Sequence, residues 1–216
     1  MNKRQFLKST LGLSLAPSLA KLLAQPATAD DEVFWATLRK AYRIKPDYIN
    51  LENGYYNILP EATLEKHIQH IRDVNYQGAY YMRTTQFPDR KAMSKLVAEV
   101  VHCSPDDLIL TRNTTESLDM IIGGFPWQAG DEAVFAIQDY GAMQDMFEQV
   151  ARRQGIVLKK VSLPLHPTND DEIVELYANA ITHKTKLLMV CHMVNVTGQI
   201  LPIRKICDMA HAKGVE

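Results

Sequence analysis

Two adjacent threonines, Thr114 and Thr115, stand between an asparagine and a glutamate in the sequence Asn113-Thr114-Thr115-Glu116. Residues 108–110 before them are apolar, and the residues after them follow a helical pattern. A helix amino terminus can hold an anion, because its first backbone N–H groups are unpaired and the helix dipole is positive there. The pair of hydroxyls therefore indicates a phosphate site, although an ordinary helix cap at Asn113 or Thr114 explains part of the same pattern.

Two other residues of chemical interest each end a predicted strand. Tyr140 ends the strand predicted over 132–140, and Asn195 ends the strand predicted over 186–195. Either residue can instead serve only to form the turn that follows the strand. A tyrosine ring can also stack on an aromatic ligand, and an asparagine amide can donate to a ligand oxygen.

Because the carboxyl ends of parallel strands meet at one edge of a sheet, the threonine pair, Tyr140 and Asn195 would lie near one another. A phosphate site, a flat ring and a polar amide together describe a pocket for a phosphorylated aromatic compound. Pyridoxal 5′-phosphate fits this description. Nicotinamide dinucleotides and nucleoside triphosphates fit poorly, since the sequence has neither a GxGxxG after a strand nor a P-loop.

The elements that must position these residues alternate regularly between residues 107 and 214. This alternation predicts an α/β fold, with a mostly parallel sheet covered by helices on both faces and preceded by a helical N-terminal segment. The predicted strands cover residues 108–113, 132–140, 156–163 and 186–195. In the N-terminal segment, residues 77–90 have the composition of a loop. Residues 215–216 look like the start of another strand, so we expect the front part of a longer protein.

Composition and charge exclude several classes of function. The 216 residues carry a formal net charge of −1 and no basic stripe, which argues against nucleic-acid binding. Three cysteines without a CxxC motif argue against a disulfide framework and a structural zinc site. The pairs Cys191-His192 and Cys207 with His211 supply too few ligands for a metal, so we expect no metal and buried structural cysteines.

The first residues have the order of an export signal. Residues 2–8 are basic, residues 11–24 are apolar but interrupted, and residues 27–29 form a small-x-small cleavage site. The basic part resembles a twin-arginine signal with Lys3 in place of the first arginine. We therefore expect residues 1–29 to direct export to a bacterial periplasm. The apolar run is too short to span a membrane, and an amphipathic helix on a cytoplasmic protein is the alternative.

Four stretches carry a resemblance to a known family: INLENGYYNILP, LILTRNTTESLDMII, DYGAM and HMVNVTGQILPI. Over residues 48–216 the chain resembles class V aminotransferases of the fold-type I pyridoxal-phosphate group, and most of all their isopenicillin N epimerase-like branch. The resemblance implies that Asn113, Thr114 and Thr115 surround the cofactor phosphate. It also implies that Tyr140 stacks on the pyridine ring and that Asn195 lies near the ring hydroxyl.

The same resemblance implies a substrate segment at Asn53 and Gly54. Arg83, in the stretch predicted as a loop, could bind a substrate carboxylate, and an ordinary surface arginine is the alternative. The resemblance also implies a homodimer acting on an amino acid, as an epimerase or an aminotransferase. We expect residues 30–90 to contribute to a small domain and residues 91–216 to form the first half of the cofactor-binding domain.

In this family the aspartate for the pyridine nitrogen and the Schiff-base lysine follow later in the chain. We therefore expect no catalytic residue within these 216. A non-catalytic fragment or a binder of a phosphorylated metabolite is one alternative. The cysteine desulfurase or lyase branch is another, although it needs a reactive cysteine on a mobile loop, and all three cysteines lie in predicted helices or strands.

Overall fold

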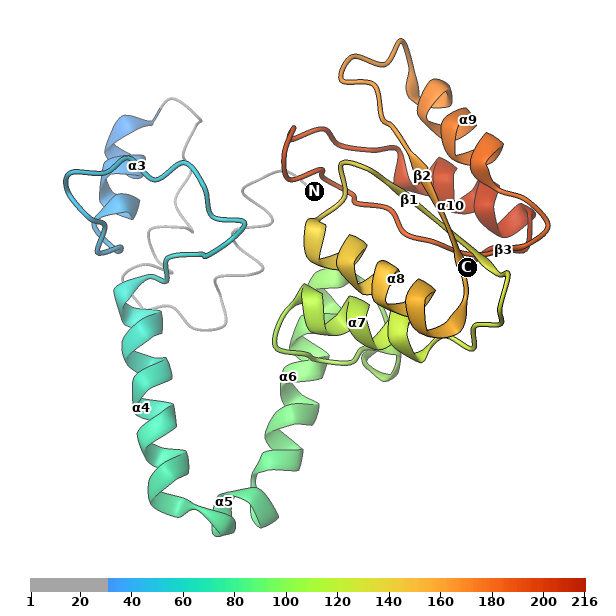
Figure 1. Ribbon diagram of the computed structural model, residues 1–216. Coiled ribbons are helices and arrows are strands. Elements are labelled where there is room, and N and C mark those ends of the chain that lie inside the picture. Colours follow the sequence, from blue (N-terminus) through green and yellow to red (C-terminus); the bar gives the residue numbers. More distant parts are fainter. Residues whose placement is uncertain (1–30) are drawn as a thin grey trace. The chain divides into compact units, whose positions relative to one another are not determined.

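The computed structural model describes residues 31–216, so the expected export signal at residues 1–29 lies outside the described part of the chain. The chain divides into two compact units, of which the first ends at Leu110 and the second spans Thr111–Glu216 (Figure 1). The domain boundaries expected from the sequence refer to the complete fold and stay a prediction. Each unit is described by itself below.

The first unit is helical, and it corrects one expectation from the sequence. Residues 77–90 are not a loop, because all but a few of them belong to three successive helices. Only Gly78, with a φ of 54°, separates the first two of these helices. The Tyr81 hydroxyl then donates to Asp89 Oδ2 at 2.8 Å and joins the second helix to the third. The helices of this unit are α3 (Glu32–Arg39), α4 (Glu61–Gln77), α5 (Ala79–Thr84), α6 (Gln86–Val101) and the 3₁₀ turn η1 (Pro105–Asp107).

The strand predicted over residues 108–113 is also wrong. Leu108 has extended backbone angles, but residues 108–110 pair with no strand in the described part of the chain. Ile109 is consequently 82% exposed. A strand needs a neighbour for its backbone hydrogen bonds, and local sequence cannot supply one.

The second unit contains a parallel sheet of three strands: β1 (Glu132–Ala136), β2 (Val157–Val161) and β3 (Thr185–Leu188), in the order β2-β1-β3. The strands are shorter than the sequence predicts, because each gives way early to the loop at its carboxyl end. The last residue extends the sheet. Glu216 donates to Lys186 O at 3.1 Å and accepts from Leu188 N at 2.7 Å. Glu216 thus pairs with the edge of β3, and the further strand expected at residues 215–216 stays a prediction.

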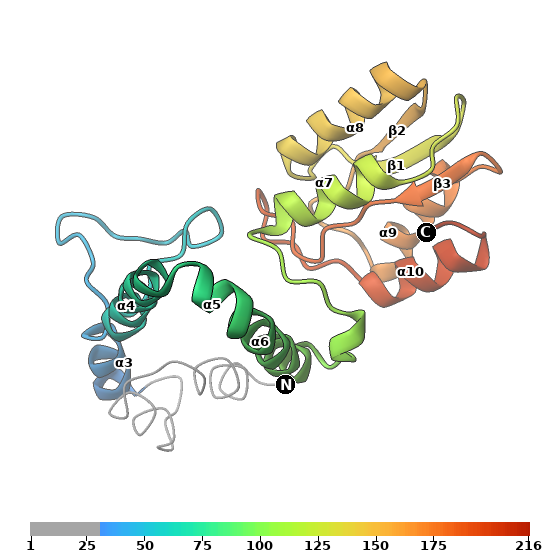
Figure 2. The same ribbon diagram turned by 90° about the horizontal axis from the view of Figure 1, so that it is seen from below.

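Helices cover both faces of this sheet, as the sequence predicts (Figures 1 and 2). The side chains of β1 alternate, as they must in a strand. Phe135 packs with α7 (Thr114–Gly124) and α8 (Gly141–Gln154), whereas Val134 and Ala136 pack with α9 (Asp170–Ala180) and α10 (Ile203–Ala212). All five residues of β1 are buried, so β1 is the centre of the core.

A buried carboxylate fixes the amino end of the sheet. Oε2 of Glu132 accepts from the Thr182 hydroxyl at 2.6 Å and from the Thr185 hydroxyl at 3.2 Å. Lys159 Nζ lies 3.6 Å from the other oxygen. The hydrogen bond from Thr182 is the main reason that the pKa of Glu132 is lowered despite burial. One side chain thus links β1 to β2 and β3.

Candidate functional site

The candidate site lies at the carboxyl edge of the sheet. α8 begins directly after the turn that follows β1, so its amino end lies at this edge. α7 runs in the opposite direction to β1, because residues 125–131 carry the chain from its end to the amino end of that strand. Figures 1 and 2 show the amino ends of α7 and α8 beside the carboxyl ends of the strands. The topology therefore brings Thr114, Tyr140 and Asn195 to one edge.

The amino end of α7 is capped by Asn113. Its side-chain oxygen accepts from Glu116 N at 2.9 Å. Oε2 of Glu116 reaches back to accept from Arg112 N at 2.7 Å, and the Arg112 guanidinium pairs with Glu116 Oε1 at 2.9 Å. This exposed ion pair lowers the pKa of Glu116, mainly through the hydrogen bond from the Arg112 side chain. The cap is therefore complete without either threonine.

The two threonines keep their donors free. Neither the hydroxyls nor the backbone N–H groups of Thr114 and Thr115 have a hydrogen-bond partner among residues 31–216. Thr114 is exposed and Thr115 is half-buried. Two hydroxyls and two N–H groups at a positive helix end form a donor set that suits the oxygens of a phosphate group.

α9 offers a direct comparison, because it is capped in the same way. Asn169 accepts from Glu172 N at 3.1 Å, and Glu172 reaches back to accept from Thr168 N at 2.7 Å. The residues after this asparagine are Asp170 and Asp171, where α7 has two threonines. Carboxylates already neutralise the first turn of α9 and would repel an anion. In α7 the first two residues are uncharged and Glu116 is paired with Arg112, so the amino end of α7 is more open to an anion than that of α9.

Tyr140 is presented by a tightly bonded turn. The turn is closed by Asp139, whose Oδ2 accepts from Ala136 N at 2.7 Å and whose N–H donates to Ala136 O at 3.1 Å. From α8, Gln144 Nε2 donates to Asp139 O at 2.8 Å and to Ile137 O at 3.1 Å. The Tyr140 side chain itself is 42% exposed. A ring held by a rigid turn and open to solvent is suited to stacking on a planar ligand.

Asn195 lies in a loop that folds back on itself after β3. The loop is closed by an antiparallel bridge between Met193 and Ile200 and by hydrogen bonds from Val194 N to Gln199 O at 2.9 Å and from Gly198 N to Val194 O at 2.7 Å. Val194 is fully buried, whereas Asn195 is exposed. No described residue hydrogen-bonds the Asn195 side chain, so its amide is available to a ligand.

Sequence reasoning missed two buried polar residues beneath this edge. Asp139 is 4% exposed, and Tyr177 on α9 is fully buried. Asp139 Oδ1 and the Tyr177 hydroxyl both lack a hydrogen-bond partner in the described chain. Cys191, which follows β3, is half-buried beside Asp139. The acidic residue directly before Tyr140 is the one signal of this position in the sequence.

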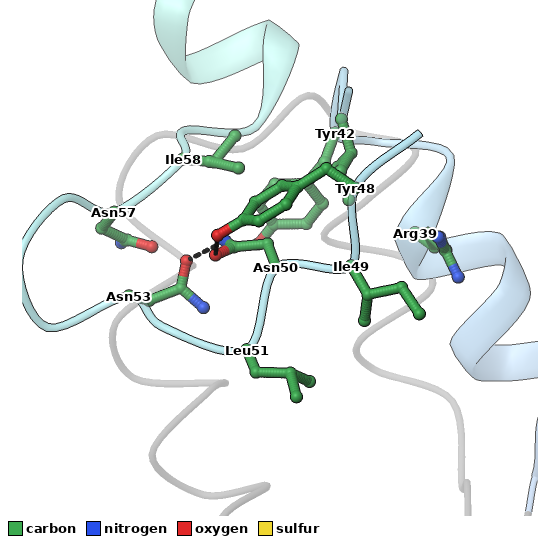
Figure 3. Close-up of a pocket in the computed structure, with 10 residues that line it drawn as sticks. Arg39, Tyr42, Tyr48, Ile49, Asn50, Leu51, Asn53, Asn57 and Ile58 are labelled. Carbon is green, nitrogen blue, oxygen red and sulfur yellow. Dashed lines mark hydrogen bonds between the residues drawn. The ribbon is translucent and has the colours of Figure 1, made fainter. Parts of the chain in front are cut away.

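The predicted substrate segment lies in the first unit. Asn53 lines a pocket of about 410 Å³. Figure 3 shows the Asn50 side chain between Tyr48 and Asn53. Its amide donates to Asn53 Oδ1 at 2.9 Å, and its oxygen lies 3.5 Å from the Tyr48 hydroxyl. Gly54 follows directly, and a Cβ there would lie 3.1 Å from Glu52 Oε1. Asparagine amides and apolar side chains line this pocket together.

Arg83 is exposed on α5 and forms no ion pair among the described residues. A guanidinium without an internal partner is available to a carboxylate. Among residues 31–216, no group of three or more His, Cys, Asp or Glu side chains could hold a metal ion. No helix in that part of the chain is both long and apolar enough to cross a membrane.

Comparison with known proteins gives a family match over most of the chain. The family model described as Aminotransferase class-V matches residues 59–216. An isopenicillin N epimerase of Amycolatopsis lactamdurans is 28% identical over 185 residues, and a probable cysteine desulfurase of a Synechocystis strain is 28% identical over 196 residues. Each alignment covers 84% of this chain and 46% of the relative. The chain thus spans about half the length of these curated relatives.

Solved structures show the same fold. The cysteine desulfurase CsdA of Escherichia coli aligns with a TM-score of 0.66 at 23% identity, over 83% of this chain and 46% of that one. A mutant of C-DES with glycine covalently linked to its pyridoxal-phosphate cofactor aligns with a TM-score of 0.63 at 23% identity, over 72% of this chain and 40% of that one. At this identity the likeness establishes the fold alone.

Proposed function

The chain belongs to the class-V aminotransferase family, and from this premise we propose that its second unit forms part of a pyridoxal-phosphate site. The enzyme to which the site belongs acts on an amino acid, as an epimerase or an aminotransferase. Pyridoxal phosphate, when bound, withdraws electrons from the α-carbon of an amino acid and so makes its proton easier to remove. Isopenicillin N epimerases among the relatives support the epimerase type.

The free donors of Thr114 and Thr115 are the observation that carries this proposal. The Asn113 oxygen is used by the cap, so its amide is the group left to approach a phosphate. The two threonines supply hydroxyls and N–H groups, and the ion pair of Arg112 with Glu116 reduces the repulsion that a free carboxylate would exert. This donor chemistry fits the phosphate of pyridoxal phosphate.

Tyr140 and Asn195 contact the pyridine ring of the cofactor. The Tyr140 ring stacks on the pyridine ring, and the rigid turn beneath it fixes the plane in which the ring lies. The Asn195 amide donates to the oxygen on the pyridine ring. Asn53, Gly54 and Arg83 bind the substrate, with Arg83 pairing with the substrate carboxylate.

Two alternatives compete with the epimerase or aminotransferase type. Cysteine desulfurases stand among both the relatives and the similar structures, which favours the desulfurase or lyase branch. A binder of a phosphorylated metabolite would use the threonines without Tyr140. The Cys191 thiol is unsuited to act as a sulfur nucleophile, because burial and the neighbouring Asp139 raise its pKa to about 11.

Equilibrium dialysis of the full chain with two ligands tests the proposal. Pyridoxal phosphate uses the threonines and Tyr140, whereas glycerol 3-phosphate uses the threonines alone. Replacement of Tyr140→Leu should lower the affinity for pyridoxal phosphate about two- to tenfold, the contribution of a stacked aromatic pair. The affinity for glycerol 3-phosphate should stay unchanged. Tyr140→Phe keeps the ring and is the matched control. Equal loss of both ligands, or no binding of pyridoxal phosphate, would reject the proposed site.

The full protein is proposed to be a homodimer. The segment that leads to the proposed substrate residues exposes apolar side chains, of which Leu51 is the most exposed at 89%. Contiguous apolar side chains at the surface are typical of protein interfaces. Sedimentation equilibrium of the full-length gene product would give the mass of one chain if this proposal is wrong.

Residues 1–29 are proposed to direct export to the periplasm. The support is the order of basic, apolar and small-residue segments. Fusion of residues 1–29 to a reporter that is active only after export tests this proposal. Activity should fall when Arg4 is replaced by Lys if the twin-arginine route is used. Reporter that stays in the cytoplasm would support the alternative of a cytoplasmic protein.

A further inference from the structure

The side chain of Gln138 ties the Tyr140 turn to the end of the neighbouring strand. Backbone pairing between β1 and β2 ends with the hydrogen bond from Ile137 N to Val161 O at 2.8 Å, because the chain then turns toward α8. Beyond this point the Gln138 amide replaces the backbone. Its Oε1 accepts from Leu163 N at 3.1 Å, and its Nε2 donates to Leu163 O at 2.8 Å. An amide side chain can do this because it carries a donor and an acceptor, as a peptide group does.

The next residue, Pro164, ties the same segment to the loop of Asn195. Proline has no backbone N–H, so Pro164 offers only its carbonyl oxygen. This oxygen accepts from Gln199 Nε2 at 3.2 Å. Gln199 belongs to the loop of Asn195, where its own carbonyl accepts from Val194 N at 2.9 Å. Because β2 and β3 lie on opposite sides of β1, the loop after β3 reaches across the carboxyl end of β1 to make this contact.

Apolar packing lies beneath these hydrogen bonds. Leu163 is 4% exposed and Val194 is fully buried, and both belong to the core cluster on the α9 side of the sheet. Gln138 and Gln199 are half-buried, so their amides lie at the boundary between this core and the surface. Apolar packing has no direction and would tolerate a slip of either loop. The directed hydrogen bonds of the two glutamines are therefore what can fix the register of the loops.

We propose that Gln138 and Gln199 are positioning residues that set the spacing between the Tyr140 ring and the Asn195 amide, with residues 163–164 as the connection between them. Gln138 lies two residues before Tyr140, and Gln199 lies four residues after Asn195. Each glutamine acts on a ligand through one of these neighbours and not by contact. The inference rests on the proposed function only for the identity of the ligand.

A planar ligand makes this spacing important. A ring that stacks on Tyr140 meets the Asn195 amide only if the two groups are held at the matching separation. Groups that are already held in place lose less freedom when the ligand binds. The connection runs in series through Gln138, residues 163–164 and Gln199. Loss of either glutamine should therefore release the two loops from each other, and loss of both should have no further effect.

Hydrogen exchange of the full chain without ligand tests the connection at the far end from each substitution. In Gln199→Met the Leu163 amide should exchange about fivefold faster, the effect of losing one hydrogen bond. Its own acceptor, on Gln138, is intact in this variant. In Gln138→Met the amides of Val194 and Gly198 should likewise exchange faster, although both of their acceptors lie within their own loop.

Two further variants control for a general loss of stability. Asn113→Ala removes a single hydrogen bond at the cap of α7 and should leave exchange at Leu163 unchanged. Gln199→Lys keeps a donor for the Pro164 carbonyl and should restore protection. Exchange that rises only in the loop that carries the substitution, or that rises equally in Asn113→Ala, would overturn the proposal.

The affinities for pyridoxal phosphate and glycerol 3-phosphate provide the second measurement. Gln138→Met and Gln199→Met should each lower the affinity for pyridoxal phosphate about fivefold, and the double variant should lower it no further. The affinity for glycerol 3-phosphate should stay unchanged, because this ligand uses neither Tyr140 nor Asn195. Additive losses, or equal loss of both ligands, would overturn the positioning role. If the wild type binds no pyridoxal phosphate, the proposed function fails, while the exchange result still decides whether the loops are connected.

Discussion

The side-chain oxygen of Asn113 lies 2.9 Å from the backbone nitrogen of Glu116 and accepts its N–H. This contact shows which residues at the amino end of α7 cap the helix and which remain available to a ligand. The cap uses Asn113 and Glu116, and it leaves Thr114 and Thr115 without an internal role among the described residues. The opposing interpretations of the motif, as a helix cap and as a phosphate site, are therefore compatible, since different residues serve each.

Replacement of Asn113→Ala should act on stability. Loss of an asparagine cap costs about 1 kcal/mol of unfolding free energy. Thr115→Val should stay within about 0.5 kcal/mol of the wild type, because no described residue uses its hydroxyl. Urea unfolding of the full chain, followed by circular dichroism, measures both. A threonine variant as unstable as Asn113→Ala would assign the threonines to the cap instead.

The double change Thr114→Asp with Thr115→Asp should distinguish the effect on helix stability from the effect on ligand affinity. It gives α7 the first turn that α9 already has. Carboxylates near a helix amino end are stabilising by about 0.3–1 kcal/mol, so the helix should be retained or strengthened. Affinity for pyridoxal phosphate should fall by about tenfold or more, because two carboxylates would face the phosphate. Unchanged affinity in dialysis would place the phosphate elsewhere.

Local signals explain which parts of the fold could be predicted from the sequence. The helix over residues 114–124 has the predicted bounds, because Asn113 caps one end and two glycines close the other. The parallel sheet with helices on both faces follows from alternating elements, and it is confirmed. The prediction of a strand at residues 108–113 failed because the pairing of a strand depends on a neighbour that is distant in the sequence. The prediction of a loop at residues 77–90 failed because only Gly78 and Thr85 interrupt the helices there.

The candidate site was predictable only at its surface. Thr114, Tyr140 and Asn195 each follow or end a predicted strand, so a general rule for parallel sheets selects them. Asp139 and Tyr177 lie buried beneath them, in a strand-end turn and in a helix. Sequence spacing does not report which polar groups are buried there, because the crossover helices and the sheet register bring them together.

Stability should depend on Glu132 in acid. Its pKa is lowered from the usual 4.5 by Thr182, Thr185 and Lys159, so its stabilising effect is present above pH 4.5 and is lost as the pH falls through the lowered value. Glu132→Gln should cost about 1.5–3 kcal/mol at pH 7, the range for hydrogen bonds to a charged group. The difference from the wild type should shrink in acid. Unfolding in urea between pH 3 and pH 7 measures it.

The matched control for this pH series is Glu148→Gln. Glu148 forms an ion pair with Lys160 at 3.1 Å, but 44% of its side chain is exposed. Exposed pairs contribute about 0–1 kcal/mol, so this variant should stay close to the wild type at every pH. A constant difference between Glu132→Gln and the wild type across the series would show that the charge of Glu132 is not what stabilises the fold.

Cys191 should resist alkylation in the folded protein. Its pKa of about 11 leaves about 0.1% of the thiol ionised at pH 8, and only the thiolate reacts. Cys103 is exposed and should react first with iodoacetamide at pH 8. Peptide mapping by mass spectrometry follows each cysteine separately, and unfolding in urea should make the two rates similar. Equal rates in the folded state would mean that Cys191 is an accessible nucleophile, and the desulfurase branch would then gain a candidate for its reactive cysteine.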